Sequence, residues 1–282
     1  MAQPELARPR EPRRIVEGSI NYAAPMDVRP RFYANDHSRD VLELEPRTVP
    51  IEDARVGPQA PSLECEGIVL VPHRSVVGDF RNAAEVAALH PREIERLILD
   101  LSGADAVVVT GTGVLRFAER SPESGRLDNS RPARFIHVDC SDATAAEFAE
   151  RSRPKHDSRR VRRFAHYNVW RTFSPPPQDV PLTVCDARTL ESHDRVPADA
   201  VFDVAGRPEW SFEGLVIRFN PRHRWLYFSN MTRDEALVFK THDSEKTAPS
   251  QVPHSAFDDP TAPPNVPPRA SIEMRAIAYW FA

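Results

Sequence analysis

The second half of the chain is a succession of strand-like segments with no helical pattern between them. From residue 165 onward, β-branched and aromatic residues gather in AHYNVWRTF, PLTVCDA, GLVIRF, RWLYFSN, ALVFKTHD and ASIEMRAIAYWF. Proline-bearing or polar turns separate these segments, and the count of 28 prolines against 10 glycines favours extended pieces and stiff loops over long helices. A run of strands without intervening helices predicts antiparallel pairing.

Helices are expected only in the first half. HPREIERLILDLSG has apolar residues at helical spacing, with Pro91 suited to the first helical position and Gly103 to the end. A second helix is expected after Cys140, with Ser141 or Asp142 as its cap. The segments GIVLVPH and ADAVVVTGT predict strands near the first helix.

These patterns together predict an α+β chain that is mainly β. We expect an antiparallel sheet or a double-sheet barrel with a few flanking helices. Residues 1–14 are rich in proline and arginine and predict a disordered arm, which leaves residues 15–282 as a single domain.

Composition narrows the choice of partners. A net charge of -4 over 282 residues gives no reason to expect nucleic acid or an anionic membrane. The basic run from Arg151 to Arg163 lacks interleaved aromatic residues, so a solvated loop is favoured there over a nucleic-acid patch. The chain has no signal-peptide pattern, no apolar run of spanning length and three scattered cysteines, which together predict a cytoplasmic protein.

A histidine and an aspartate two residues apart are the first candidate site. In RFIHVDC, His137 and Asp139 point to the same side of a strand because side chains alternate with period two. Two histidines and one carboxylate on one face hold Fe(II) in non-haem oxygenases. The pair alone is a weak signal, since a buried hydrogen-bonded His–Asp pair has the same spacing.

The C-terminal region offers a third ligand and an anion site. His254 stands 15 residues before Arg269. In RASIEMR, Arg269, Ser271 and Arg275 share one strand face with Glu273. Buried arginines need a partner, which could be Glu273 itself or a dicarboxylate co-substrate bound by the guanidinium fork.

Ten segments, read in order, resemble a known family. They are SINY, IEDAR, SGADAVVV, LRF, IHVDCS, NVWRTF, PLTVCDARTL, RWLYFSNMTRDEALVFKTHDS, PHSAF and RASIEMRAIAY. Together they resemble the Fe(II)/2-oxoglutarate oxygenases, and more specifically the secondary-metabolite hydroxylase/desaturases of fungi and bacteria. That family includes the cephalosporin 7α-methoxylation component and a fungal meroterpenoid endoperoxide-forming enzyme. The resemblance runs from about Gly18 to the C-terminus, and so many motifs in one order are specific.

The resemblance implies a double-stranded β-helix, or jelly roll, with iron held by His137, Asp139 and His254. His242 in FKTHDS competes for the third position because it lies on a stronger strand. His254 is preferred because PHSAF matches the family and because its distance to Arg269 suits adjacent strands.

The resemblance also implies 2-oxoglutarate as co-substrate. Arg269 and Ser271 would hold its distal carboxylate, with Arg275 as the alternative. Relatives tend to have a histidine before the first arginine of this region, where the chain reads TGTGVLRF, so that histidine's role is in doubt here.

The remaining expectations concern the substrate and the subunits. Motif position and strand phase suggest Asn168, Trp170, Arg171, Tyr227 and Lys240 as lining or supporting residues, although Trp170 could simply pack in the core. The predicted reaction is hydroxylation or desaturation of a small-molecule natural product with O2, in a monomer or in a homo- or heterodimer.

Two other functions stay open from the sequence. A non-catalytic jelly-roll subunit could keep the fold and support a catalytic partner. An S-adenosylmethionine methyltransferase is suggested by a strand that enters Gly111 and Gly113, but the third glycine and a crossover helix are missing.

Overall fold

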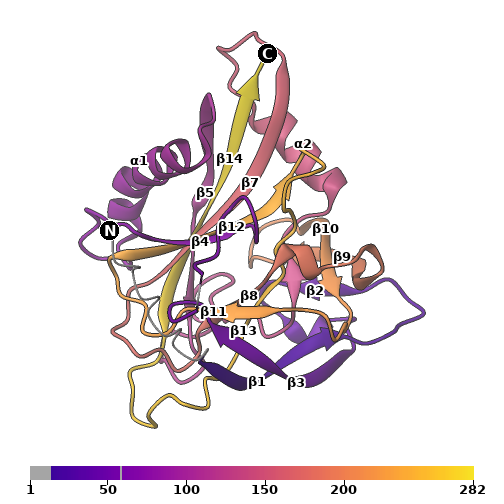
Figure 1. Ribbon diagram of the computed structural model, residues 1–282, viewed down its shortest axis with the longest axis vertical. Coiled ribbons are helices and arrows are strands. Elements are labelled where there is room, and N and C mark those ends of the chain that lie inside the picture. Colours follow the sequence, from indigo (N-terminus) through magenta and orange to yellow (C-terminus); the bar gives the residue numbers. More distant parts are fainter. Residues whose placement is uncertain (1–13, 58) are drawn as a thin grey trace, which may run out of the picture.

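Two β-sheets that face each other form the body of the protein. The computed structural model describes residues 14–57 and 59–282, so most of the expected arm at 1–14 lies outside the described residues. Within this range the strands form a nine-stranded and a five-stranded sheet. Figure 1 shows the smaller sheet around β14 above the larger one.

The nine-stranded sheet is mainly antiparallel, with parallel pairing of β11 to β3 and of β2 to β9. In spatial order it contains β1 (Ile15–Ala23), β3 (Leu44–Asp53), β11 (Trp225–Tyr227), β8 (Leu182–Cys185), β13 (His254–Ala256), β6 (His137–Val138), β10 (Trp210–Ile217), β9 (Arg195–Phe202) and β2 (Arg31–Tyr33). Short 3-10 turns lie at His37–Arg39, Ala187–Thr189 and Ser192–Asp194.

The five-stranded sheet is antiparallel throughout. In spatial order it contains β4 (Ile68–Pro72), β12 (Glu235–Asp243), β7 (Val161–Thr172), β14 (Ala270–Phe281) and β5 (Ala106–Phe117). The expected antiparallel pairing of the C-terminal segments is therefore confirmed.

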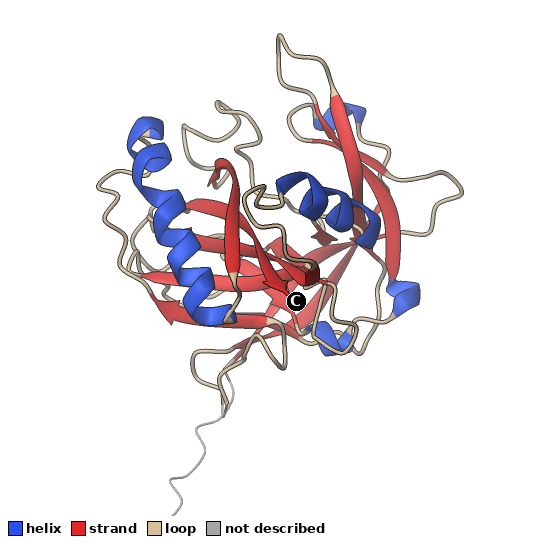
Figure 2. Cartoon of the chain, turned by 90° about the horizontal axis from the view of Figure 1, so that it is seen from above, coloured by secondary structure: helices blue, strands red, loops and turns tan. Residues whose placement is uncertain are grey.

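The core lies between the sheets, and a second core lies under a helix. Trp170 and Phe239 from the smaller sheet pack with Val184 and Leu226 from the larger one. On the outer face, α1 (Ala83–Ser102) covers alternate residues of β14, such as Met274, because strand side chains alternate between faces. Figure 2 shows α1 along the outside of the strands.

The first helix begins earlier than expected. Asn82 caps it by accepting a hydrogen bond from the Glu85 amide, so Pro91 lies inside the helix and the prediction of Pro91 as the first helical residue is wrong. The alanine-rich AAEVAAL segment favours helix strongly enough that the helix begins before Pro91 and continues through it. Gly103 ends it in the left-handed conformation, as expected.

The second helix, α2 (Asp142–Ser152), is capped by Ser141 as expected. It packs on the face of β14 opposite α1, with Ala149 beside Ile277 and Tyr279. The strand β5 continues through Gly111 and Gly113 without a crossover helix, which removes the basis of the methyltransferase alternative. No helix in the described residues is long and apolar enough to cross a membrane.

Burial of His90 on the inner face of α1 makes stability depend on pH. Desolvation lowers the pKa of His90 to about 4, although Glu93 accepts its hydrogen bond. Between pH 6.5 and 4 the unfolded chain binds a proton that the folded chain does not, so stability falls as pH falls through this window, by up to ~1.4 kcal/mol per pH unit.

We predict that His90→Gln makes the free energy of unfolding fall less steeply with pH in that window. Denaturant titrations at pH 4 to 7 measure the slope. Leu89→Gln, which changes an exposed neighbour on the same helix, is the control and should keep the wild-type slope. An unchanged slope for His90→Gln would contradict the assignment.

Candidate metal centre

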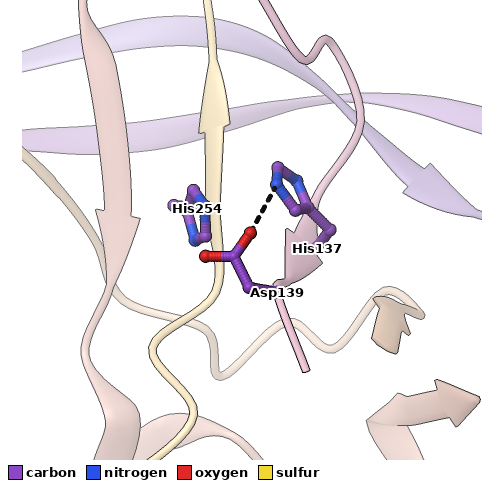
Figure 3. A group of neighbouring side chains, drawn as sticks. All are labelled: His137, Asp139 and His254. Carbon is purple, nitrogen blue, oxygen red and sulfur yellow. Dashed lines mark ion pairs between the residues drawn. The ribbon is translucent and has the colours of Figure 1, made fainter. Parts of the chain in front are cut away.

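Strand pairing in the larger sheet brings two histidines face to face. His137 begins β6, His254 begins β13, and the register places them directly opposite each other. Asp139 follows β6 and lies on the side of His137, as the alternation of side chains predicts. Figure 3 shows the Asp139 carboxylate close to both imidazole rings.

The three side chains form a compact donor group. One ligand atom from each of His137, Asp139 and His254 lies within 4.8 Å of the others. The ring centroids of the two histidines are 4.3 Å apart, and His137 Nε2 is 4.0 Å from Asp139 Oδ1. Donor atoms at this separation can converge on one cation with little movement.

Backbone contacts fix which ring nitrogens face the group. His137 Nδ1 is 3.1 Å from the Phe135 carbonyl, and His254 Nδ1 is 3.3 Å from the Val252 carbonyl. Since a carbonyl only accepts, each Nδ1 carries the proton and donates. Each Nε2 is left with a free lone pair, the tautomer that binds a metal.

Burial and charge set the protonation states that a metal requires. Desolvation lowers the pKa of His137 to about 3 and also lowers the pKa of His254. Burial opposes ionisation of Asp139, but the Arg275 guanidinium and the hydrogen bond from Asn168 hold the pKa of its carboxyl far below the usual range. The group is therefore two neutral imidazoles and one carboxylate at neutral pH.

Both oxygens of Asp139 are held from the opposite sheet. Asn168 Nδ2 of β7 donates to Oδ2 at 2.6 Å. Arg275 Nη2 of β14 donates to Oδ1 at 2.8 Å, while its Nε donates to Glu273 at 3.0 Å. The expectation that Arg275 pairs with Glu273 thus matches the structure, and its guanidinium is also tied to the candidate ligand.

Arg269 is a buried cation without a carboxylate partner in the described part of the chain. It is 1% exposed, Nη1 donates to the Val180 carbonyl at 2.8 Å, and Nε has no partner. Desolvation, with smaller contributions from Arg116 and Arg134, lowers the pKa of Arg269 to about 9. It lines a narrow cavity together with His137, His254 and Trp170. A buried guanidinium beside a donor group suits a bound carboxylate.

Several predicted site residues lie close to this centre and others do not. Ser271 is fully buried on β14, two residues after Arg269, and its hydroxyl donates to the Arg116 carbonyl at 3.4 Å. Trp170 packs in the core between the sheets and also borders the cavity. His242 is outside the group: its Nδ1 is 3.1 Å from Asp142 of α2 and its ring stacks on Phe164.

The structure corrects three of the suggested substrate contacts. Arg171 points to the outer face of β7 and donates to the His73 carbonyl at 3.1 Å. Lys240 also turns outward and donates to Asp243 at 2.9 Å. Tyr227 packs edge-to-face on Phe257 in the core of the larger sheet. These directions were predicted wrongly because the sequence does not show which face of β7, β11 and β12 meets the other sheet.

Sequence reasoning did not assign the other walls of the site. Arg116 of β5 borders both the narrow cavity and a second cavity beside His137, and it donates to the Asn129 carbonyl at 3.0 Å. Phe202, Trp210 and Phe212 of the β9–β10 hairpin border cavities that reach Asp139. The alternation of side chains along LRF in β5 could have indicated that Arg116 faces the site. No sequence pattern indicated that the residues of the β9–β10 hairpin border it.

Comparison with known proteins places the chain among oxidoreductases. The model of a family described as Oxidoreductase/YMDC permease-like domain matches residues 20–279. Hydroxylase/desaturase CTB9 of Cercospora beticola is 29% identical over 255 residues, which cover 84% of this chain and 78% of that protein. Fe(II)/2-oxoglutarate-dependent dioxygenase nvfI of Aspergillus novofumigatus is 29% identical over 250 residues, covering 88% and 82%.

A solved structure has the same architecture. The iron and alpha-ketoglutarate-dependent endoperoxidase NvfI superposes with a TM-score of 0.80 at 24% identity, covering 95% of this chain and 99% of that one. The expected fold, a mainly β jelly roll with a few flanking helices, is confirmed by this likeness.

We predict that Asn168→Ala weakens binding of a divalent metal by about 10- to 100-fold, because partners that orient ligands contribute this much affinity. Titration with Mn(II), followed by electron paramagnetic resonance, measures the free ion. Val169→Ala removes a buried neighbour that faces away from Asp139, and it should keep wild-type affinity. Equal losses in both variants would show that the effect is structural.

Proposed function

The chain belongs to the Oxidoreductase/YMDC permease-like family, and we propose that it is an Fe(II)- and 2-oxoglutarate-dependent oxygenase. Its reaction is hydroxylation, desaturation or a related oxidation of a small-molecule natural product by O2. One observation carries the proposal: His137 and His254 of the compact His137–Asp139–His254 group line the same cavity as Arg269, a buried guanidinium whose Nε has no hydrogen-bond partner. The names of the relatives, hydroxylase/desaturase and dioxygenase, support the same activity.

The donor set fits Fe(II). Two neutral imidazoles and one carboxylate on one side leave the other coordination positions open, which is the arrangement of non-haem iron oxygenases. When bound, Fe(II) with 2-oxoglutarate supplies oxygen-dependent attack on an unactivated C–H bond and releases succinate and carbon dioxide. His137, Asp139 and His254 would hold the iron. His242 is not proposed as the third ligand, because its ring is turned toward α2.

The co-substrate site fits a dicarboxylate. Arg269 would bind the distal carboxylate of 2-oxoglutarate through its unpartnered side, since its guanidinium is buried and has no carboxylate of its own. Ser271 would stabilise this end of the site. Arg275 is the poorer candidate because Asp139 and Glu273 already occupy its donors. Its role in the proposal is to keep Asp139 ionised and in place.

The walls of the cavity exclude water from the reacting centre. Trp170, Leu182 and Ala256 contribute apolar surface around the two imidazoles. In such a setting a charged hydrogen bond is stronger than in water, so the ligands and the arginine are held in fixed positions before substrate binds.

Cell location and assembly complete the proposal. We propose a cytoplasmic enzyme, formed by residues 15–282 as one unit, that acts alone or with a second identical or different subunit. Neither nucleic acid nor a membrane is a proposed partner, because the net charge of -4 gives no electrostatic basis for either.

We predict that the apoprotein, titrated anaerobically with Fe(II) and then 2-oxoglutarate, develops the visible charge-transfer band of a ketoacid chelate. Asp139→Ala and His254→Ala should abolish the band with the fold intact, as judged by circular dichroism, whereas His242→Ala should keep it. A folded wild-type protein without the band would favour the non-catalytic subunit instead.

We predict that Arg269→Leu weakens 2-oxoglutarate binding by about 30-fold or more while Fe(II) binding persists, because losing a buried charged partner costs roughly 2–5 kcal/mol. The band intensity against 2-oxoglutarate concentration gives the affinity. Arg171→Leu, at a fully buried arginine on the outer face of β7, is the matched control. A larger loss in Arg275→Leu with retained iron would exchange the two roles.

A further inference from the structure

A third cavity borders Asp139, and Arg269 is not on its wall. Its volume is about 290 Å³, close to the lower end of the roughly 300–1,000 Å³ of small-molecule sites. Asp139, Asn168 and Arg275 lie on its wall, so a molecule in this cavity reaches the candidate metal centre. The narrow cavity at Arg269 is not lined by Phe202, Trp210 or Phe212, which border this one. The two cavities can therefore hold two different molecules.

One wall of this cavity is an aromatic shelf, formed by Phe202, Trp210 and Phe212. The rings of Phe202 and Trp210 are stacked, with centroids 4.4 Å apart and planes 15° apart. Phe202 and Phe212 are also stacked, at 5.4 Å and 25°. The shelf comes from β9 and β10, two paired strands of the sheet that carries His137.

Trp210 is exposed in a way that the other tryptophans are not. It is 50% exposed, whereas Trp170, Trp225 and Trp280 are at most 6% exposed. Because Trp210 borders the cavity, part of its exposed ring surface is available to a bound molecule. Phe148 of α2 extends the apolar surface and meets Phe212 edge-to-face, with centroids 5.2 Å apart.

The charges around the cavity favour a neutral or acidic molecule. The carboxylate of Asp139 is already paired with Arg275. His166 donates through Nε2 to the Ala145 carbonyl, and burial lowers its pKa to about 4, so it is uncharged at neutral pH. Arg151, at the exposed rim over the Phe148 ring, is a further positive group. No unpaired carboxylate lines this cavity among the described residues, so a cationic molecule has no partner here.

We propose that the oxidised substrate is a planar aromatic or conjugated ring compound, neutral or acidic, stacked on the shelf of Phe202, Trp210 and Phe212. This inference rests on the proposed oxygenase function, because it names the substrate class of the same centre. Stacking on the shelf positions the ring edge toward Asp139 and the metal, while Asn168 and Thr241 offer polar contacts to ring substituents.

Two probes that share one carbon skeleton test the proposal. 2-Naphthol is planar, whereas decahydro-2-naphthol is saturated and cannot stack. Calorimetric titration of the Fe(II)- and 2-oxoglutarate-loaded protein under argon should give binding of 2-naphthol at least about fivefold tighter than its saturated analogue, since stacked aromatic pairs contribute this much. Equal affinities, or no binding of either probe, would overturn the substrate class.

A matched pair of variants locates the effect. Trp210→Leu should remove the preference for 2-naphthol while retaining the ketoacid chelate band. Phe219→Leu, at an exposed aromatic residue 37% accessible and absent from the cavity wall, should keep the preference. A preference that survives in Trp210→Leu would place the aromatic site elsewhere. Loss of the chelate band in the wild-type protein would instead refute the proposed function, so the two failures are distinguishable.

Discussion

The pairing of β6 with β13 is the constraint on which the centre depends. It sets His137 directly opposite His254, and Asp139 then reaches the same side because it is two residues further along. A slip of one residue in this register would turn one imidazole to the other face of the sheet. The two neighbouring strands, β8 and β10, hold β6 and β13 in place from both sides.

The two sheets are joined at this centre by a few polar contacts. The candidate ligands come from the larger sheet, whereas Asn168, Arg275 and Arg269 come from β7 and the segment at β14 of the smaller one. Breaking the contact between Asp139 and Arg275 would leave the Asp139 carboxylate with Asn168 as its remaining side-chain donor, which is costly for a largely buried charge. The closed arrangement of the sheets and the ionised state of the ligand therefore depend on each other.

Local patterns explain why part of this was predictable. The i, i+2 spacing of His137 and Asp139 and the shared face of Arg269, Ser271 and Arg275 follow from strand geometry alone, and the motif order supplied His254. The predicted start of α1 is wrong because the helix-forming segment AAEVAAL outweighs the helix break expected at Pro91. The outward direction of Arg171 and Lys240, and the aromatic shelf, depend on which face of each strand meets the other sheet. That choice is made by long-range packing, which a single sequence does not reveal.

X-ray absorption at the iron edge of the Fe(II)- and 2-oxoglutarate-loaded protein tests whether His137, Asp139 and His254 hold the metal, because it reports the ligand atoms themselves. We expect two imidazoles with oxygen donors in the remaining positions, and a single imidazole after His254→Ala. A sulfur ligand from Cys140, or an unchanged imidazole signal in His254→Ala, would contradict this expectation.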